Sequence, residues 1–298
     1  MSVNAADVKK LRDMTNAGFM DCKKALAETN GDLDGAVKLL RERGIAKAVK
    51  VSSRVATEGL VNATLAPSGA SGVLVEVNCN TDFVARNPDF VTLASELTQL
   101  AHTTCCTTPD QLVALPYRGK TVKDVLIEQT ATIGENISVG RVALLSDTTG
   151  LGLIDAYIHP PGKIGVLLHI QASDASVLKN DKVKQAAHDI CLHIAACAPR
   201  FVDSSAVDAA TLEAEKAIYI NQALNEGKPQ AIAEKMVAGR IKKFYEQVCL
   251  LDQPFVKDGD VTVAKVLAAA AKDAGGELKV VAFARIAVGE GVEEPAES

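Results

Sequence analysis

The 298-residue sequence predicts an α+β protein with a small helical module, two similar core subdomains with antiparallel sheets, and a helical hairpin. Three observations lead to this fold class. A stretch typical of strands and turns occurs twice, about 48 residues are present only in the second copy, and a helical first segment lies outside the repeat. The predicted boundaries are 1–54 for the module and linker, 55–147 for the first subdomain and 148–298 for the second.

The duplication is visible when residues 59–77 are aligned with residues 152–170, an offset of 93 positions. Eight of these 19 aligned positions are identical. Each copy holds two apolar runs separated by Pro and Gly residues, which is typical of a β-hairpin. Apolar residues at helical spacing follow in both copies, around 90–102 and 183–195. Both subdomains are therefore expected to combine a hairpin with a helix.

The extra residues of the second copy lie between about 198 and 250. They carry apolar residues at helical spacing, such as Met236, Ile241 and Phe244, with one interruption at "EGKP", residues 226–229. Gly suits the end of a helix and Pro suits the start of one. The insertion therefore predicts two antiparallel helices, serving either as an internal support or as a docking or dimer surface. A helix and strand segment is expected to complete the subdomain after it.

The first 45 residues predict three short helices with little core. Asn30 and Gly31 favour the end of one helix, and Asp32 can cap the next. A basic stretch follows, with Lys47, Lys50 and Arg54, but no aromatic residue lies between them for base stacking. A solvated linker helix is therefore expected there, and not a nucleic-acid patch.

Composition narrows the classes of function. The net charge of −5 argues against a nucleic-acid footprint along the whole chain. No apolar run approaches the ~20 residues of a membrane helix, and the first residues lack the pattern of a signal peptide. A cytosolic protein without a membrane partner is expected. The seven cysteines form no C-x-x-C pair, so neither a disulfide framework nor a zinc site is favoured.

Motifs for covalent chemistry are absent from the sequence. It contains no phosphate-binding G-x-x-x-x-G-K-[ST] loop, no dinucleotide-binding G-x-G-x-x-G after a strand, and no G-x-S-x-G or H-E-x-x-H. Among the five histidines, only His188 and His193 cluster, together with Cys191 on one predicted helix, but the spacing of these three residues does not place them on one helical face. We therefore expect no catalytic residues, no metal and no cofactor.

The duplication draws attention to residues that the fold does not need. At the 93-residue offset, "NTDFV" at 80–84 aligns with "SDASV" at 173–177, so the scaffold forms without Asp82 or Phe83. An aromatic side chain at a strand end that the scaffold does not require is typical of a partner contact. Phe19 and Met20, placed between two predicted helices of a very small module, raise the same expectation. The sequence thus favours protein binding over catalysis.

Six ordered motifs resemble the bacterial elongation factor Ts family along essentially the whole chain. They are "LRDMTNAGFMDCKKAL" (11–26), "EVNCNTDFVAR" (76–86), "IGENISVGRVA" (133–143), "YIHPPGKIGVL" (157–167), "GKPQAIAEKMVAGRIKKF" (227–244) and "QPFV" (253–256). Asn16 stands where the family usually has Gly, and Asn tolerates the left-handed backbone that the turn uses. The resemblance implies an N-terminal module like a ubiquitin-associated (UBA) domain, a duplicated α+β core and a coiled-coil hairpin.

The resemblance also implies a function: guanine-nucleotide exchange on elongation factor Tu, with no covalent step. The family binds the GDP-bound and nucleotide-free partner and promotes GDP release. Positions matching the segment that disturbs the partner's magnesium site are Thr81, Asp82, Phe83 and Val84. Positions matching the N-terminal contact with the GTPase domain are Arg12, Phe19 and Met20. Positions matching a contact with another domain of the partner are His159, Gly162 and Ile164.

Two further arrangements stay open. Some members of the family form dimers through the hairpin, so a homodimer through the second subdomain is one partner arrangement to test. A different class of function is an adaptor that binds a ubiquitin-like or nascent-chain partner through its N-terminal module. Only the first 45 residues support the adaptor, whereas the six motifs are spread over the chain.

Overall fold

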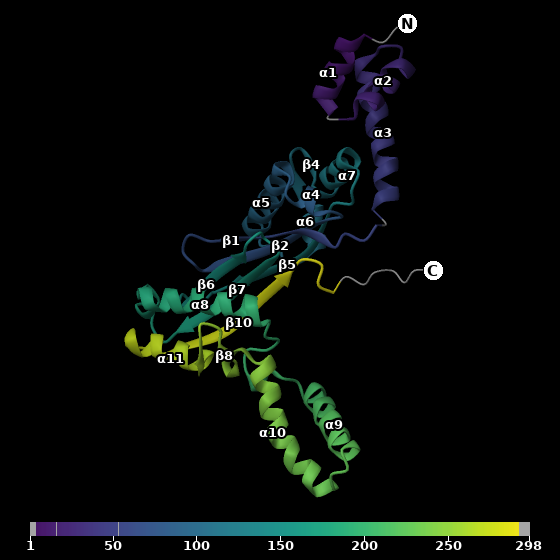
Figure 1. Ribbon diagram of the computed structural model, residues 1–298. Helices are drawn as coiled ribbons and strands as arrows, with labels where there is room; N and C mark the ends of the chain where they lie inside the picture. The colour runs from purple at the N-terminus through teal and green to yellow at the C-terminus, as the bar shows by residue number, and fades with distance from the viewer. Residues whose placement is uncertain (1–3, 16, 53, 292–298) are drawn as a thin grey trace. The chain divides into compact units, whose positions relative to one another are not determined.

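The computed structural model describes residues 4–15, 17–52 and 54–291 (Figure 1). The turn expected at Asn16 lies outside the described residues. The chain divides into two compact units, which we describe separately. Unit 1 groups Met1–Asn62, Val75–Val142 and Ala287–Ser298, and unit 2 groups Ala63–Leu74 and Ala143–Ile286.

Unit 1 begins with a three-helix bundle made of α1 (Ala5–Thr15), α2 (Phe19–Glu28) and α3 (Leu33–Val51). Its core contains the buried residues Val8, Leu11, Cys22, Ala25, Leu26 and Ala36. After α2 the chain turns through Asn30 and Gly31, whose φ angles are 52° and 87°. The Asp32 side chain then accepts a hydrogen bond from the Asp34 amide at 3.1 Å, which confirms the predicted cap of α3.

The sheet of unit 1 has the strand order β1-β2-β5. Its strands are β1 (Glu58–Leu65), β2 (Ser71–Cys79) and β5 (Ser138–Ser146), although their distal residues 63–74 and 143–146 are grouped with unit 2. All of β2 after its first residue is buried, which explains the apolar run Val73, Leu74 and Val75 in its sequence. Its two buried polar residues pair with each other, since Asn78 Nδ2 donates to Glu76 Oε1 at 2.9 Å. The helices of unit 1 that follow β2 are α4 (Asp82–Ala85), α5 (Pro88–Thr103), α6 (Pro109–Ala114) and α7 (Val122–Ile133), and α6 and α7 are separated by the short strands β3 (Pro116–Tyr117) and β4 (Lys120–Thr121).

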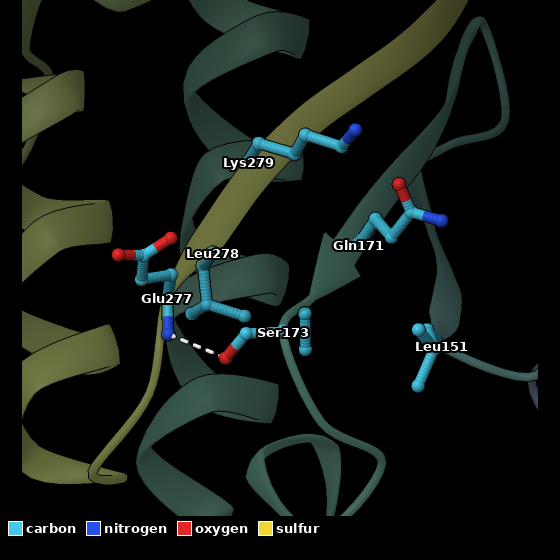
Figure 2. A pocket seen from close by; sticks show the side chains of 7 residues that line it. Leu151, Gln171, Ser173, Glu277, Leu278 and Lys279 are labelled. Carbon is cyan, nitrogen blue, oxygen red and sulfur yellow. Dashed lines mark hydrogen bonds between the residues drawn. The ribbon is translucent and has the colours of Figure 1, made fainter.

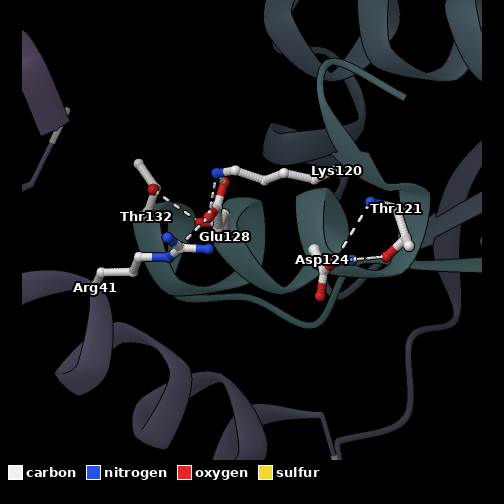
Figure 3. Close-up of polar contacts among 6 residues, drawn as sticks. All are labelled: Arg41, Lys120, Thr121, Asp124, Glu128 and Thr132. Atoms are coloured by element: carbon white, nitrogen blue, oxygen red, sulfur yellow. Dashed lines mark hydrogen bonds and ion pairs between the residues drawn. The ribbon is translucent and has the colours of Figure 1, made fainter. Parts of the chain in front are cut away.

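The bundle helix α3 contacts α7 within unit 1. Arg41 Nε lies 3.4 Å from Glu128 Oε1, and Lys120 Nζ lies 2.5 Å from the same oxygen (Figure 3). A Cβ atom at Gly44 would come within 2.9 Å of the Ala131 side chain, so the two helices approach closely there. The expected linker helix is therefore the end of α3, but it is only partly solvated, because Ala48 and Val51 are buried and Gly44 lies against α7.

The sheet of unit 2 has the order β10-β7-β6, with β6 (Gly152–His159), β7 (Ile164–Ala172) and β10 (Leu278–Ala287). The hairpin of β6 and β7 is antiparallel, pairing Gly152 with Gln171 and His159 with Ile164. Buried side chains of β7 pack in one core with those of α8 (Asp181–Cys197) and α11 (Val263–Asp273). The short strands β8 (Pro254–Phe255) and β9 (Asp258–Thr262) pair with each other. In both three-stranded sheets the central strand is the second strand of a hairpin.

The insertion forms two packed helices, α9 (Ala209–Asn225) and α10 (Gln230–Val248) (Figure 1). Gly227 between them has a φ of 77°, and Pro229 is the N-cap residue of α10, as the "EGKP" interruption predicts. Arg240 Nη1 donates to Gln222 Oε1 at 2.7 Å across the pair. The mixture of helices with antiparallel strands confirms the predicted α+β class. None of the described helices is long and apolar enough to cross a bilayer.

Candidate partner-binding site

The segment that follows β2 presents a large apolar side chain to solvent: Phe83 is 82% exposed. It lies on the four-residue helix α4, whose N-cap residue is Thr81. The Thr81 hydroxyl accepts a hydrogen bond from the Val84 amide at 3.4 Å, and Ala85 is buried beneath the turn. Leaving a Phe ring in water forgoes ~1.5–3 kcal/mol of burial, so this side chain does not serve the stability of the free protein.

A carboxylate from a distant loop holds the start of this segment. Glu135, between α7 and β5, accepts hydrogen bonds from the backbone amides of Asn80 and Thr81 at 3.2 and 3.0 Å. Its other oxygen accepts from the Thr81 hydroxyl at 2.7 Å. Hydrogen bonds to a charged acceptor are stronger than neutral ones, so these three contacts restrain the backbone on which Phe83 is carried.

Two asparagines extend the same network. The backbone amide of Asn136 donates to Asn80 Oδ1 at 2.7 Å, and Asn80 Nδ2 donates to the Val55 carbonyl at 2.8 Å. Asn136 Nδ2 donates to the Arg54 carbonyl at 2.9 Å. The loop after β2, the loop before β5 and the linker before β1 are therefore joined by side-chain amides. By contrast, Asp82 makes an exposed ion pair with Arg86 at 3.0 Å, which contributes little to stability.

The predicted N-terminal contact residues are all exposed. Arg12 lies in the last turn of α1, and Phe19 and Met20 form the first turn of α2. The structure therefore places Phe19 and Met20 within a helix and not between two helices as expected. Met14 in α1 is 55% exposed and was missed by the sequence analysis, because a Met at helical spacing is equally typical of a core residue. Three large apolar side chains on so small a bundle are consistent with a docking surface.

The third predicted set lies at the β6–β7 turn of unit 2. His159 pairs with Ile164 across the hairpin, and the Gly162 amide donates to the His159 carbonyl at 2.8 Å. Of the three, His159 is exposed, and Tyr157 Oη lies 2.9 Å from its Nδ1. Gly162 is buried with a φ of 99°, and Ile164 packs partly against the core of unit 2. Gly162 and Ile164 therefore shape the turn that displays His159.

The histidines of α8 do not form a metal site. His188 Nδ1 lies 3.2 Å from Asp155 Oδ2, whereas His193 is fully buried and its Nε2 lies 2.8 Å from Gln253 Oε1. Burial lowers the pKa of His193, which favours the neutral ring, and its Nδ1 accepts from the Val256 amide at 3.1 Å. Within the parts of the chain that the structure describes, no three His, Cys, Asp or Glu residues are grouped so that they could hold a metal ion.

A shallow hollow in unit 2, with a volume of about 320 Å³, lies beside Gln171, Ser173 and Lys279 (Figure 2). The Ser173 hydroxyl in its wall accepts a hydrogen bond from the Glu277 amide at 3.0 Å. This serine is therefore engaged in joining two segments of the fold. The hollow offers no pair of nucleophile and base, and the exposed side chains described above are the stronger candidates for function.

These features define a class of protein that works by contact with another protein. Its candidate site is an exposed aromatic side chain on a restrained turn, supplemented by exposed apolar and polar side chains on the bundle and on a hairpin turn.

Comparison with known proteins identifies the family. A family model described as Elongation factor TS matches residues 80–290. Curated relatives named Elongation factor Ts include one from Clostridium botulinum (strain Eklund 17B / Type B), 45% identical over 99% of this chain and 96% of the relative. One from Clostridium perfringens (strain ATCC 13124) is 46% identical over the same shares, and one from Magnetococcus marinus is 44% identical over 100% and 96%.

This chain therefore belongs to the elongation factor Ts family. Its function is that of a nucleotide exchange factor for elongation factor Tu in translation elongation, as the sequence resemblance implied. The adaptor alternative is not favoured. The family match covers residues 80–290, whereas the adaptor hypothesis depends on the first 45 residues alone.

Proposed function

We propose that residues 81–84 open the nucleotide site of elongation factor Tu, with Phe83 as the side chain that inserts. Thr81, Asp82 and Val84 accompany it and disturb the coordination of Mg²⁺ and the phosphates of GDP. The observation that carries this proposal is the exposure of Phe83 on a backbone that Glu135 restrains. An apolar ring that is unburied in the free factor can gain burial only when a partner offers a matching pocket.

The physical basis is thermodynamic linkage. GDP held at nanomolar affinity has ~12 kcal/mol of binding free energy, much of it through phosphates and Mg²⁺. A factor that binds the nucleotide-free partner more tightly than the GDP-bound partner weakens GDP by the same factor by which GDP weakens it. Phe83 supplies such differential binding if its pocket exists only in the opened partner. No covalent step and no cofactor are needed, so the protein acts without being an enzyme in the chemical sense.

Other surfaces supply affinity in this proposal. The three-helix bundle serves as a UBA-like module that docks on the GTPase domain through Arg12, Phe19 and Met20. The β6–β7 turn, with His159, Gly162 and Ile164, contacts another domain of the partner. The packing of α9 on α10 supports a coiled-coil hairpin, and a homodimer through the second subdomain is the assembly to test by light scattering. A role in translation elongation implies a cytoplasmic location.

The central experiment measures release of a fluorescent GDP from elongation factor Tu in excess unlabelled GDP. We expect the parent protein to accelerate release and Phe83→Ala to lose ~10- to ~100-fold of that acceleration, corresponding to ~1.5–3 kcal/mol of lost burial. Val281→Ala is the matched control, because Val281 is also apolar and exposed but lies on β10 of unit 2.

Thermal unfolding of the same variants gives the second readout. Because the Phe83 ring is solvated in the free protein, we expect its removal to leave stability nearly unchanged. An equal loss of exchange in Phe83→Ala and Val281→Ala, or a large loss of stability in Phe83→Ala, would contradict insertion. No acceleration by the folded parent would refute exchange on this partner.

A further inference from the structure

The amide of a helix N-cap residue needs an acceptor, and proteins usually supply it locally. In a capping box the side chain at the third helical position reaches back to the N-cap amide. Helix α7 follows this rule: Asp124 accepts from the Thr121 amide at 3.3 Å, and the Thr121 hydroxyl accepts from the Asp124 amide at 3.1 Å (Figure 3). The acceptor and the cap are three residues apart.

Helix α4 departs from this rule at the functional segment. Its N-cap residue is also a threonine, Thr81, but the third helical position is Val84, whose side chain accepts no hydrogen bond. Glu135, 54 residues further along the chain, accepts from the Thr81 amide instead. It also accepts from the preceding amide, of Asn80, and from the Thr81 hydroxyl. A distant carboxylate thus completes the cap that the local sequence omits.

The position of Glu135 is itself restrained. Helix α7 ends at Ile133 and is capped by Gly134, whose φ of 84° is the left-handed conformation that Gly adopts readily, and Glu135 follows directly. On its other side the Asn136 amide donates to Asn80 Oδ1 at 2.7 Å. The carboxylate is therefore held between a helix end and a hydrogen bond to the very loop that it restrains.

We propose that Glu135 is a positioning residue for nucleotide exchange, which orients Phe83 by completing the N-terminal cap of α4. This inference rests on the proposed insertion of Phe83. Without Glu135, two adjacent backbone amides lose their acceptor and the segment samples other conformations before it enters the partner. The cost of ordering it again falls on the step in which GDP is displaced and not on the initial encounter, which uses other surfaces.

The test compares Glu135→Ala with Glu135→Gln in steady-state exchange. We expect Glu135→Ala to lower kcat ~10-fold while KM for the GDP-bound partner changes less than ~3-fold. Glu135→Gln keeps an oxygen for the two amides and can donate to the Thr81 hydroxyl, so it should stay within ~3-fold of the parent. Glu96→Ala is the matched control, because Glu96 also holds a distant segment, through Arg118 at 2.8 Å, but does not touch residues 80–84.

A double-mutant cycle separates positioning from a direct contact. If Glu135 acts through Phe83, then Glu135→Ala should change kcat less than ~2-fold when Phe83 is already Ala. Additive losses would overturn the inference, and so would a rise in KM at unchanged kcat. If the parent accelerates GDP release and Glu135→Ala does so equally well, this inference alone fails. If the parent does not accelerate release, the proposed function fails, and the inference with it.

Amide hydrogen exchange on the free protein provides a readout that needs no partner. We expect the Asn80 and Thr81 amides to lose protection in Glu135→Ala and to keep it in Glu135→Gln, while the amides of the β2 core stay protected in both. Unchanged protection of these two amides in Glu135→Ala would overturn the capping role. Loss of protection throughout β2 would show a general structural role and would equally overturn it.

Discussion

The segment after β2 and the segment after β7 follow equivalent hairpins, yet they expose different kinds of side chain. Phe83 in the first is 82% exposed, whereas the aligned Ser176 in the second donates its hydroxyl to Asp174 at 2.5 Å. The next residue of the second segment, Val177, is buried in the core of unit 2. The second segment therefore satisfies its own polar groups and buries its apolar residue, while the first leaves a large apolar residue exposed to solvent.

The two segments are also anchored by different groups. In unit 2, Ser173 and Glu277 exchange hydrogen bonds at 3.0 Å, from the Ser173 amide to the Glu277 carbonyl and from the Glu277 amide to the Ser173 hydroxyl. In unit 1, a single carboxylate, that of Glu135, receives two backbone amides. The second segment is fixed partly by the burial of Val177, whereas Phe83 in the first segment is not buried. Charge-assisted hydrogen bonds to Glu135 restrain the backbone of the first segment instead.

The largest effect should come from moving the aromatic side chain between the two segments. We expect Phe83→Ser to lose ~10- to ~100-fold of the acceleration of GDP release, and we expect the added change Ser176→Phe not to restore it. The reason is that Ser176, although also exposed, is held by a local carboxylate, that of Asp174, and not by one from a distant loop as Thr81 is. The measurement is fluorescent GDP release, with Ser176→Phe alone as the control. Recovery of exchange in the Phe83→Ser/Ser176→Phe variant would contradict the proposed functional difference between the two segments.

A smaller effect, in stability, should come from Val177. Because Val177 is 2% exposed, we expect Val177→Ala to lower the free energy of unfolding by about 1–2 kcal/mol, from lost burial and a small cavity. Denaturant unfolding measures this, with Val281→Ala as a solvent-facing control that should change stability by less than about 0.5 kcal/mol. The exchange rate of folded Val177→Ala should match that of the parent. A stable but exchange-deficient variant would mean that the second segment also contacts the partner.

The smallest effect should be a difference in acid sensitivity between the two central strands. Glu76 in β2 and His169 in β7 are aligned and both buried. Burial raises the pKa of Glu76, but hydrogen bonds from Arg141 and Asn78 outweigh it, so its pKa lies below 4.5. Burial lowers the pKa of His169 below 6.5, and the nearby Lys279 adds to this, although Asp147 opposes it.

The two strands should therefore lose stability in different pH ranges. The native-state pKa values of Glu76 and His169 both lie below the values in the unfolded chain. The stability that each group contributes is therefore complete above its unfolded pKa and is lost as pH falls toward its native pKa. Hydrogen exchange corrected for intrinsic rates should show β7 weakening below pH 6.5 while the Glu76 contribution to β2 persists to about pH 4.5. His169→Gln, which does not titrate, should flatten the slope for β7. An unchanged slope would assign the acid sensitivity to other groups.

Much of the fold follows from signals that lie close together in the sequence. The two hairpins, the helices after them and the break at "EGKP" come from apolar periodicity and from Pro and Gly residues, which act over a few positions. The capped turn before α3 is equally local. The division into two units was not visible in the sequence, because its boundary runs through the middle of strands β1, β2 and β5 and not through a loop. The predicted three-part boundaries remain a prediction.

The candidate site was predictable only in part. The duplication singled out Phe83, because the aligned segment of the second copy has no aromatic residue. Glu135 could not be found in the same way, since a search for a capping box looks three residues beyond the threonine and finds Val84. Likewise, nothing local indicates that Glu76 and His169 are buried at aligned positions, because burial of a polar group depends on partners such as Arg141 and Asp147.

The remote cap of α4 has a consequence for how the segment can change. Because Glu135 satisfies the Thr81 amide, the side chains of Asp82, Phe83 and Val84 have no part in that task. In a locally capped helix, substitution at the third position would sacrifice the cap, as it would at Asp124 of α7. We therefore expect side-chain substitutions at these three positions to leave the acceptor of the Thr81 amide in place, which makes the segment a natural starting point for selecting factors with altered partner preference.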